Sequence, residues 1–257
     1  FATRNLHMPS SVANLQRKLY SLLVLIVRFL TSTKFHGQGR ICPICTASSK
    51  SFLPFGRHPR PEAQCWKCHS LERHRFFWQF FTSTPEITLK ENQKLLHVAP
   101  EACLRLKLQQ YVGDGYLTAD LLAKNVDVKM DITDIKFPDG HFDAIYCSHV
   151  LEHVLDDRKA IREFFRVLKP GGWAILLVPI IAEETFEDAS IRTPEARLKA
   201  FGQEDHVRNY GPDYIERLLE ADFLVETFSP IDILAASEIK TLGLGMEAGE
   251  IFLCRKK

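Results

Sequence analysis

The sequence lacks an apolar run long enough to cross a membrane. Its longest uninterrupted run extends from Leu22 to Val27, and a longer one must include Ser21 and Arg28. Because a membrane-spanning helix needs about 20 apolar residues, we expect no transmembrane span. Residues 12–30 predict a helix with basic flanks that packs on the body, contacts a partner or makes a peripheral membrane contact. We therefore expect a cytoplasmic protein, with membrane-peripheral attachment left open.

Acidic side chains are scarce at the start of the chain. The first 80 residues contain 12 Lys and Arg but only Glu62 and Glu72, whereas the whole chain has a net charge of +1. The remainder therefore carries a net charge of about −9. Basic segments of this kind bind phosphate or an anionic membrane surface in some proteins and are simply solvated in others. RNA is therefore left open as a partner.

Glycine is missing where a nucleotide-binding fold most needs it. Residues 95–104 read LLHVAPEACL, which predicts a buried strand that leads into a helix. Such folds place a glycine-rich turn there, because glycine permits a tight turn and a close approach of the backbone to the ligand. The absence excludes the standard glycine-rich fingerprint. Whether the turn binds a cofactor then depends on the residues that replace glycine.

The length and composition predict one main domain with an appendage. With 257 residues, of which 46% are apolar and 25% are charged, the chain can bury a full core. From about residue 94, strand-like and helical segments alternate, which is typical of an α/β fold with a doubly wound, mostly parallel sheet. We predict a basic N-terminal segment with an apolar helix, a cysteine module with a linking helix, and the α/β domain, over residues 1–39, 40–82 and 83–257.

Four of the seven cysteines form two C-x-x-C pairs. Cys42 pairs with Cys45 and Cys65 with Cys68, and nineteen residues separate the pairs. This is the spacing of a structural zinc ribbon, in which two hooks supply four thiolates to one tetrahedral Zn²⁺ ion. Because four sulfur ligands leave no open coordination position, the metal is expected to stabilise the module rather than catalyse. Two disulfides or free thiols are the alternative.

Two long runs resemble a known family of enzymes. Residues 130–154 read MDITDIKFPDGHFDAIYCSHVLEHV, and residues 162–179 read REFFRVLKPGGWAILLVP. In this order they resemble the class I S-adenosylmethionine-dependent methyltransferases, in particular the type 11 group, and the resemblance covers about residues 94–257. It implies a Rossmann-like sheet of seven strands, a methyltransferase activity, and S-adenosylmethionine as the cofactor.

The resemblance also implies cofactor-binding residues at the ends of strands. Asp120 stands where a carboxylate accepts hydrogen bonds from ribose hydroxyls. Asp131 and Ile132 stand where the family places the adenine, and Ser148 is expected to line the same pocket. For the two aspartates, a solvated strand end is the alternative.

The glycine-free turn departs from the family pattern. Ala99, Glu101 and Cys103 stand where the family has glycines, and His97 replaces its acidic residue. Ala99 is the smallest substitute, and Pro100 suits the first turn of a helix. We hypothesise that Ala99 preserves the turn and that Glu101, or a water it holds, binds the ammonium group of the cofactor. The alternative for Glu101 is a charge that only favours the helix N-terminus.

Two histidines and an arginine are the candidate catalytic residues. His149 directly follows a predicted strand, and His206 and Arg208 lie in the segment DHVRNYG, where class I enzymes place substrate-specific insertions. Histidine has a pKa near neutrality and suits the removal of a proton from an acceptor hydroxyl. Arg208 is expected to hold an anionic or polar group of the substrate. Alternatively, His206 and Arg208 pair with Asp205 and only order the loop.

Three functions remain open from the sequence. The first is O-methylation of a small-molecule or glycan-like acceptor, with the zinc ribbon covering or presenting it. The second is RNA methylation, in which the basic front holds phosphate while Phe52, Phe55 and Trp66 stack on bases. The third is a non-catalytic binding protein that has lost its glycine motif. Cofactor binding separates the first two functions from the third.

Overall fold

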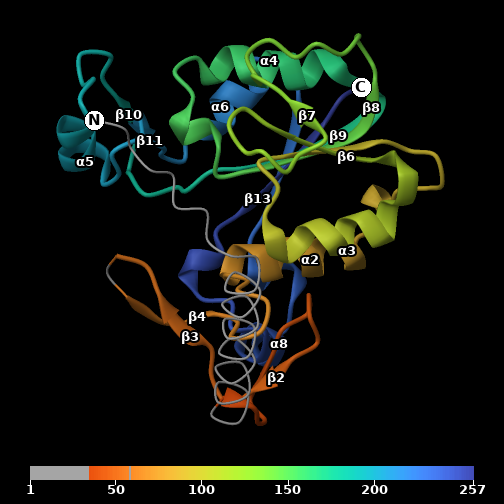
Figure 1. The fold of residues 1–257 in the computed structure, drawn as a ribbon, viewed down its shortest axis with the longest axis vertical. Helices are drawn as coiled ribbons and strands as arrows, with labels where there is room; N and C mark the ends of the chain where they lie inside the picture. The colour runs from red at the N-terminus through yellow and green to blue at the C-terminus, as the bar shows by residue number, and fades with distance from the viewer. Residues whose placement is uncertain (1–34, 58) are drawn as a thin grey trace, which may run out of the picture.

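The structure is a computed structural model that describes residues 35–57 and 59–257 (Figure 1). The helix predicted at residues 12–30, with its proposed membrane or partner contact, lies outside the described residues. Within them, no helix is both long and apolar enough to cross a membrane.

Seven strands form the central sheet, in the order β12-β13-β9-β8-β5-β6-β7. The strands from β5 to β9 run parallel to one another, and β13 is antiparallel to both of its neighbours. Helices cover both faces, so the predicted α/β class with a mostly parallel sheet is confirmed. The strands are β5 (Leu95–Val98), β6 (Tyr116–Asp120), β7 (Val128–Lys129), β8 (Phe142–Ser148), β9 (Leu168–Leu177), β12 (Leu224–Phe228) and β13 (Ile251–Arg255).

The alternation of side chains along the buried strands explains the two helical layers. In β8, Ile145 and Cys147 pack on one face, whereas Ala144 and Tyr146 pack on the other. On the first face lie α4 (Asp157–Val167) and α6 (Tyr214–Leu219), and on the second lie α2 (Glu72–Ser83) and α3 (Ala102–Val112) (Figure 1).

Helix α2 joins the cysteine module to the sheet. Its four buried phenylalanines belong to the same apolar cluster as the inward side chains of β8, β9 and β13. The ring of Phe77 stacks on that of Tyr146 with 3.8 Å between centroids. The domain boundary at residue 83 stays a prediction, but α2, which precedes it, is a core helix of the α/β layer.

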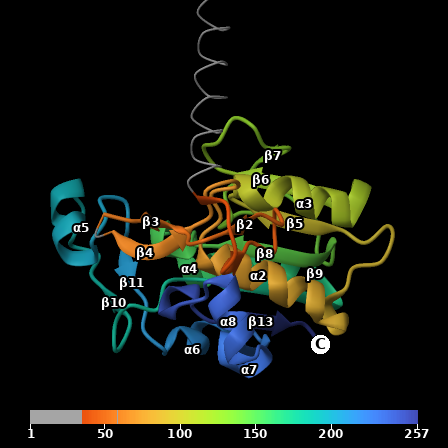
Figure 2. The same cartoon turned by 90° about the horizontal axis from the view of Figure 1, so that it is seen from below.

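The cysteine module is built from two small antiparallel ladders. One pairs β1 (Arg40–Ile41) with β2 (Ser48–Ser49), and the other pairs β3 (Leu53–Phe55) with β4 (Arg60–Gln64). The C-terminal helix α8 (Ala236–Leu242) lies beside β1 of the module and near α2, and α7 (Pro230–Ile233) packs against α8 (Figure 2). The cysteine module, α2 and the C-terminal helices, which are far apart in the sequence, therefore lie together on one side of the sheet.

The buried side chain of Arg75 in α2 holds these segments together. Its guanidinium donates hydrogen bonds of 2.7–2.9 Å to four backbone carbonyls: those of Ala63 and Ser70 in the cysteine module, and those of Leu242 and Gly243 at the end of α8. It also lies 4.0 Å from the centre of the Phe52 ring. Gly243 has a φ of +61°, and a Cβ there would lie 2.7 Å from that ring, so both backbone and space require glycine.

The chain between β9 and α6 forms a lobe at the edge of the sheet. It contains β10 (Phe186–Glu187), α5 (Pro194–Phe201) and β11 (Arg208–Asn209), and β10 pairs antiparallel with β11. This pairing brings the predicted DHVRNYG segment next to the loop that follows β8.

Candidate active site

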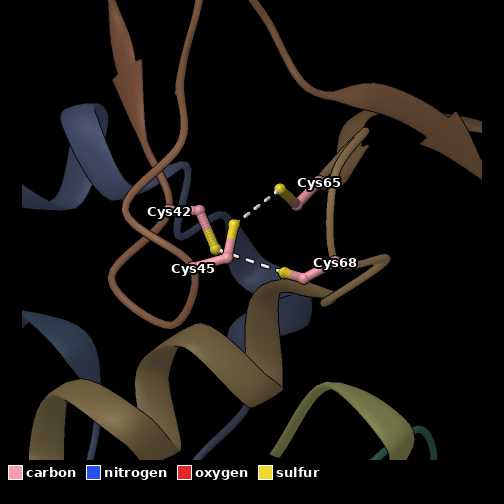
Figure 3. Close-up of side chains that lie close together, drawn as sticks. All are labelled: Cys42, Cys45, Cys65 and Cys68. Carbon is pink, nitrogen blue, oxygen red and sulfur yellow. Dashed lines mark hydrogen bonds between the residues drawn. The ribbon is translucent and has the colours of Figure 1, made fainter. Parts of the chain in front are cut away.

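The four predicted metal-binding cysteines converge in space (Figure 3). Their sulfur atoms all lie within 4.8 Å of one another, and the Cys42–Cys68 and Cys45–Cys65 pairs are 3.5 and 3.7 Å apart. Four thiolates around one tetrahedral ion at Zn–S distances of about 2.3 Å would be separated by about 3.8 Å. The donor set and spacing therefore fit a tetrathiolate metal site, and disulfides are not formed.

The two hooks repeat one backbone geometry. In each, the residue after the second cysteine has a positive φ, 59° for both Thr46 and His69, and donates its N–H to the carbonyl of the first cysteine. The amide of the first cysteine in turn donates to the carbonyl of the residue that follows Thr46 or His69, which is Ala47 in one hook and Ser70 in the other. Hydrogen bonds among the thiols, that of Cys45 first, lower the pKa of Cys42, and the hydrogen bond with Cys42 raises the pKa of Cys45 and of Cys65. A metal ligand must be deprotonated, so an ion bound here would displace the protons that these thiols share.

The glycine-free turn keeps a backbone conformation that glycine usually supplies. Ala99 has a φ of +48°, and its N–H donates to the carbonyl of Ala119 in β6. The register of β5 with its neighbours, Val98 opposite both Ala119 and Cys147, puts Ala99 beside the ends of β6 and β8. Pro100 precedes α3 instead of lying in its first turn, because Glu101 is the N-cap residue.

Glu101 lies at the centre of a buried polar cluster. One carboxylate oxygen is 2.8 Å from Nε2 of His97, whose Nδ1 lies 2.7 Å from the hydroxyl of Tyr116. The other oxygen lies 3.6 Å from Nε2 of His74 in α2 and has no hydrogen-bond partner among the described residues. Burial opposes ionisation of Glu101, but the bond with His97 prevails and lowers its pKa to about 2. Helix α2, which follows the cysteine module, therefore contacts the N-cap residue of α3 through His74.

The remaining predicted cofactor residues lie at the same edge of the sheet. Asp120 ends β6, and its Oδ1 accepts the N–H groups of the second and third residues after it, which fixes the carboxylate at the strand end. Asp131 makes a similar turn and is exposed, whereas Ile132 is buried. Ser148 is buried, and its hydroxyl lacks a partner among the described residues. These positions fit a nucleoside-containing ligand that crosses the ends of β5, β6 and β8.

His149 lies at the wall of a cavity of about 660 Å³. The cavity is lined by the chain that leaves β9, by residues of the C-terminal segment, and by Arg73 of α2. His149 has a φ of +55°, a conformation that is strained for a residue with a Cβ and that occurs often at functional sites. Its Nδ1 lies 3.3 Å from a carboxylate oxygen of the buried Glu152. Of the three candidate catalytic residues, His149 alone lines this cavity.

His206 is buried beside the loop that follows β8. Its ring packs edge-on against that of His153, with 4.6 Å between ring centres. Burial, and next the neighbouring His153, lower the pKa of His206.

The carboxyl group of Glu152 has a lowered pKa. Burial alone would raise this pKa, but the hydrogen bond with His149 outweighs burial.

The guanidinium of Arg208 is fully engaged within the protein. It donates to the carbonyls of Leu151, Val154 and Leu155 and to the carboxylate of Glu187 in β10. None of its three nitrogens lacks a partner. The arrangement matches the alternative in which Arg208 orders the loop, although its partners are backbone carbonyls and Glu187 instead of Asp205.

Three functional candidates were missed from the sequence: Glu152, His153 and His74. The first two lie in the quoted run LEH, and the third lies in the linking helix. One local signal could have found Glu152, which stands three residues after His149. No local pattern marks the other contacts, because His74 meets Glu101, and His153 meets His206, only when distant segments pack together.

Comparison with known proteins supports the methyltransferase class. Residues 111–176 match the family model described as "Methyltransferase domain". The matched segment runs from the end of α3 into β9, and it includes Asp120, Asp131, Ile132, Ser148 and His149. It supports a class I, S-adenosylmethionine-dependent methyltransferase. The cysteine module, the glycine-free turn after β5 and the C-terminal segment lie outside the match.

The similar proteins are similar over limited lengths. The chain is 46% identical over 67 residues to the ubiquinone/menaquinone biosynthesis C-methyltransferase UbiE of Vibrio campbellii, 26% of each protein. It is 29% identical over 106 residues to ajmaline N-methyltransferase of Rauvolfia serpentina, 41% of this chain and 34% of that protein. The chain thus spans about a quarter to a third of these curated relatives. The YcgJ protein of Bacillus subtilis superimposes with a TM-score of 0.48 at 17% identity, over 72% of this chain and 99% of that one.

The burial of His74 predicts a stability loss in mild acid, which the neighbouring carboxylate of Glu101 only partly offsets. Burial lowers the pKa of His74 to about 3 from 6.5, so the folded state requires the neutral imidazole. Its stabilising contribution is complete above pH 6.5 and is lost as the pH falls toward 3. We expect the free energy of unfolding to fall by about 2 kcal/mol between pH 6.5 and 5 from this residue, at about 1.4 kcal/mol per pH unit.

Urea denaturation at pH 6.5 and 5 checks this expectation. His74→Gln should show a pH dependence that is smaller by that amount, whereas His36→Gln, at an exposed position, should behave like the parent. An identical pH dependence in His74→Gln and the parent would contradict the assignment.

Proposed function

We propose that the protein transfers a methyl group from S-adenosylmethionine to a hydroxyl of a small-molecule or glycan-like acceptor. The single observation that carries this proposal is the position of His149. It lies between the strand ends that would hold the cofactor and a cavity large enough for a small acceptor. The acceptor class and the oxygen as methylated atom are our inference, since the named relatives act on carbon and nitrogen.

The residues at the three strand ends fit the cofactor. Ala99 keeps the turn in a left-handed conformation, which lets the backbone approach the ligand. Asp120 is placed to accept from the ribose, and Ser148 and Glu101 each have a buried oxygen without a partner among the described residues. When bound, S-adenosylmethionine supplies an electrophilic methyl group on a sulfonium. The cationic ligand suits the carboxylate of Glu101, which remains ionised because of its low pKa.

His149 is placed to act as the general base. Glu152 contacts Nδ1 of its ring, which favours the tautomer with the proton on Nδ1 and leaves Nε2 to accept a proton from the acceptor hydroxyl. The buried Glu152 orients the ring and stabilises the imidazolium that forms. Arg208 then has a positioning role, because it holds the carbonyls on either side of Glu152.

Helix α2 and the C-terminal segment, both of which are tied to the cysteine module, contribute to the acceptor side. Arg73 of α2 lines the cavity, and the C-terminal segment held by Arg75 forms another wall. We assign zinc to the four cysteines as a structural ion. Of the three aromatic residues considered for base stacking, Phe52 is buried under Arg75 and is unavailable to a base, whereas Phe55 is exposed.

Calorimetric titration with S-adenosylmethionine and S-adenosylhomocysteine tests the function first. We expect micromolar binding, and about 10- to 100-fold weaker binding of S-adenosylmethionine by Glu101→Gln, because a charge-assisted hydrogen bond contributes about 1.5–3 kcal/mol. Glu86→Gln, at an exposed position, is the control. Equal affinity in Glu101→Gln would refute its role, and failure of the parent to bind either ligand would favour the non-catalytic alternative.

Replacement of His149 should separate chemistry from binding. In His149→Gln we expect kcat for an acceptor found by screening hydroxylated compounds and glycans to fall roughly 10²- to 10⁴-fold, with cofactor affinity retained. His141→Gln, a histidine distant from the cavity wall, should keep parental turnover. Unchanged turnover in His149→Gln would exclude the base role.

Metal analysis checks the zinc assignment. Purified, undenatured protein should contain at least one zinc per chain, since four thiolates complete the coordination of one ion. Cys65→Ser should lose the ion and lower the melting temperature, because metal binding and folding of such modules are coupled. Protein that is folded and contains no zinc would contradict the assignment.

A further inference from the structure

Three metal-binding side chains meet beside the candidate base. Glu152 and His153 belong to the short helix η3 (Leu151–His153) directly after β8, and His206 comes from the lobe segment before β11. One ligand atom from each lies within 4.8 Å of the other two. These residues are separate in sequence and in structure from the four cysteines.

Two buried atoms of this cluster lack hydrogen-bond partners. Oε2 of Glu152 and Nδ1 of His206 have none among the described residues, and their residues are 2% and 4% exposed. Buried polar atoms are nearly always paired, because an unpaired one loses its hydration without compensation. An unpaired carboxylate oxygen beside two imidazoles is a donor set that suits a cation.

The surroundings of the cluster resemble the outer shell of a metal site. Nδ1 of His153 lies 3.2 Å from the carboxylate of Asp205, and the second oxygen of Glu152 faces His149. Metal-binding histidines usually contact a carboxylate through their other nitrogen, which fixes the tautomer and the ring orientation. His153 would then use Nε2 as its ligand atom.

The backbone around the cluster is firmly held. Arg208, two residues after His206, bonds the carbonyls of Leu151 and Val154 on either side of the other two candidate ligands. The amide of Val207 donates to the carbonyl of Glu152. The two segments therefore keep their relative position before any ion binds, as a preorganised site requires.

We infer that Glu152, His153 and His206 bind one divalent first-row transition-metal ion. Two imidazoles and one carboxylate suit zinc, iron, cobalt or nickel, and three protein ligands leave positions open for water or another oxygen ligand. The site adjoins His149 and so the acceptor cavity. An acceptor hydroxyl bound there would have a lowered pKa, a consequence that rests on the proposed function, whereas the metal site itself does not.

Cobalt titration of the full chain tests the site without acceptor or cofactor. The protein is first treated with EDTA, and its remaining zinc is measured. We expect Co²⁺ to bind with one ion per chain at this site, with weak visible absorption and without the intense thiolate-to-cobalt bands that a cysteine site produces. His206→Ala and His153→Gln should each weaken binding more than about 100-fold, since even outer-shell changes cost 10- to 100-fold.

Matched variants make the outcome decisive. Asp205→Asn should weaken binding by roughly 10-fold or more, and His36→Ala should leave it unchanged. His153 is partly exposed, so its replacement does not open the core and keeps the test valid if His206→Ala unfolds. Absence of cobalt binding outside the cysteines, or binding that survives His153→Gln, would overturn the inference. Either result leaves the roles of His149 and Glu101 to their own tests.

Discussion

The buried guanidinium of Arg75 is the interaction on which the arrangement of the molecule depends. A charged side chain inside a protein is tolerated only when its donors are paired, and Arg75 meets that condition by bonding carbonyls of both the cysteine module and the C-terminal segment. Those carbonyls meet only when α2, the module and α8 occupy their present positions. Because the C-terminal segment is also a wall of the cavity, one side chain connects the folding of the module to the shape of the acceptor site.

The same logic recurs on the other side of the candidate active site. Asp157, at the start of α4, accepts from the hydroxyl of Tyr210 and from Arg217, while Glu187 bonds both Arg208 and Arg217. The charges of the two carboxylates and the two guanidiniums balance, so Asp157, Arg208 and Arg217 can be buried and still hold the lobe segment against the loop after β8. These contacts bring His206 of the lobe beside Glu152 and His153 of that loop.

Sequence reasoning succeeded where the physical signal is local. The cysteine spacing predicted the convergence of Cys42, Cys45, Cys65 and Cys68, and the alternation of strand-like and helical segments predicted the mostly parallel sheet. It was less accurate where the partners are distant. The position of His206 and Arg208 in the DHVRNYG segment suggested side chains that face a substrate. The structure buries both, and Arg208 finds its acceptors at residues 151–155 and 187. For Glu101, a position at the N-terminus of a helix was expected from the sequence. Its contact with His74 could not be expected, because it forms only when α2 packs beside the start of α3.

The sequence by itself determined the α/β class, the cysteine hooks and the strand ends at which Ala99, Asp120 and Ser148 stand, because periodicity and spacing are properties of neighbouring residues. Only the tertiary structure decided which side chains share a site. His149 lines the cavity, and Arg208 donates its hydrogen bonds mainly to backbone carbonyls. Glu152, His153 and His206 each have a ligand atom within 4.8 Å of the other two. The physical reason is that a charged group is buried and paired by residues from distant segments. Those segments come together only when the sheet, its helices and the cysteine module pack.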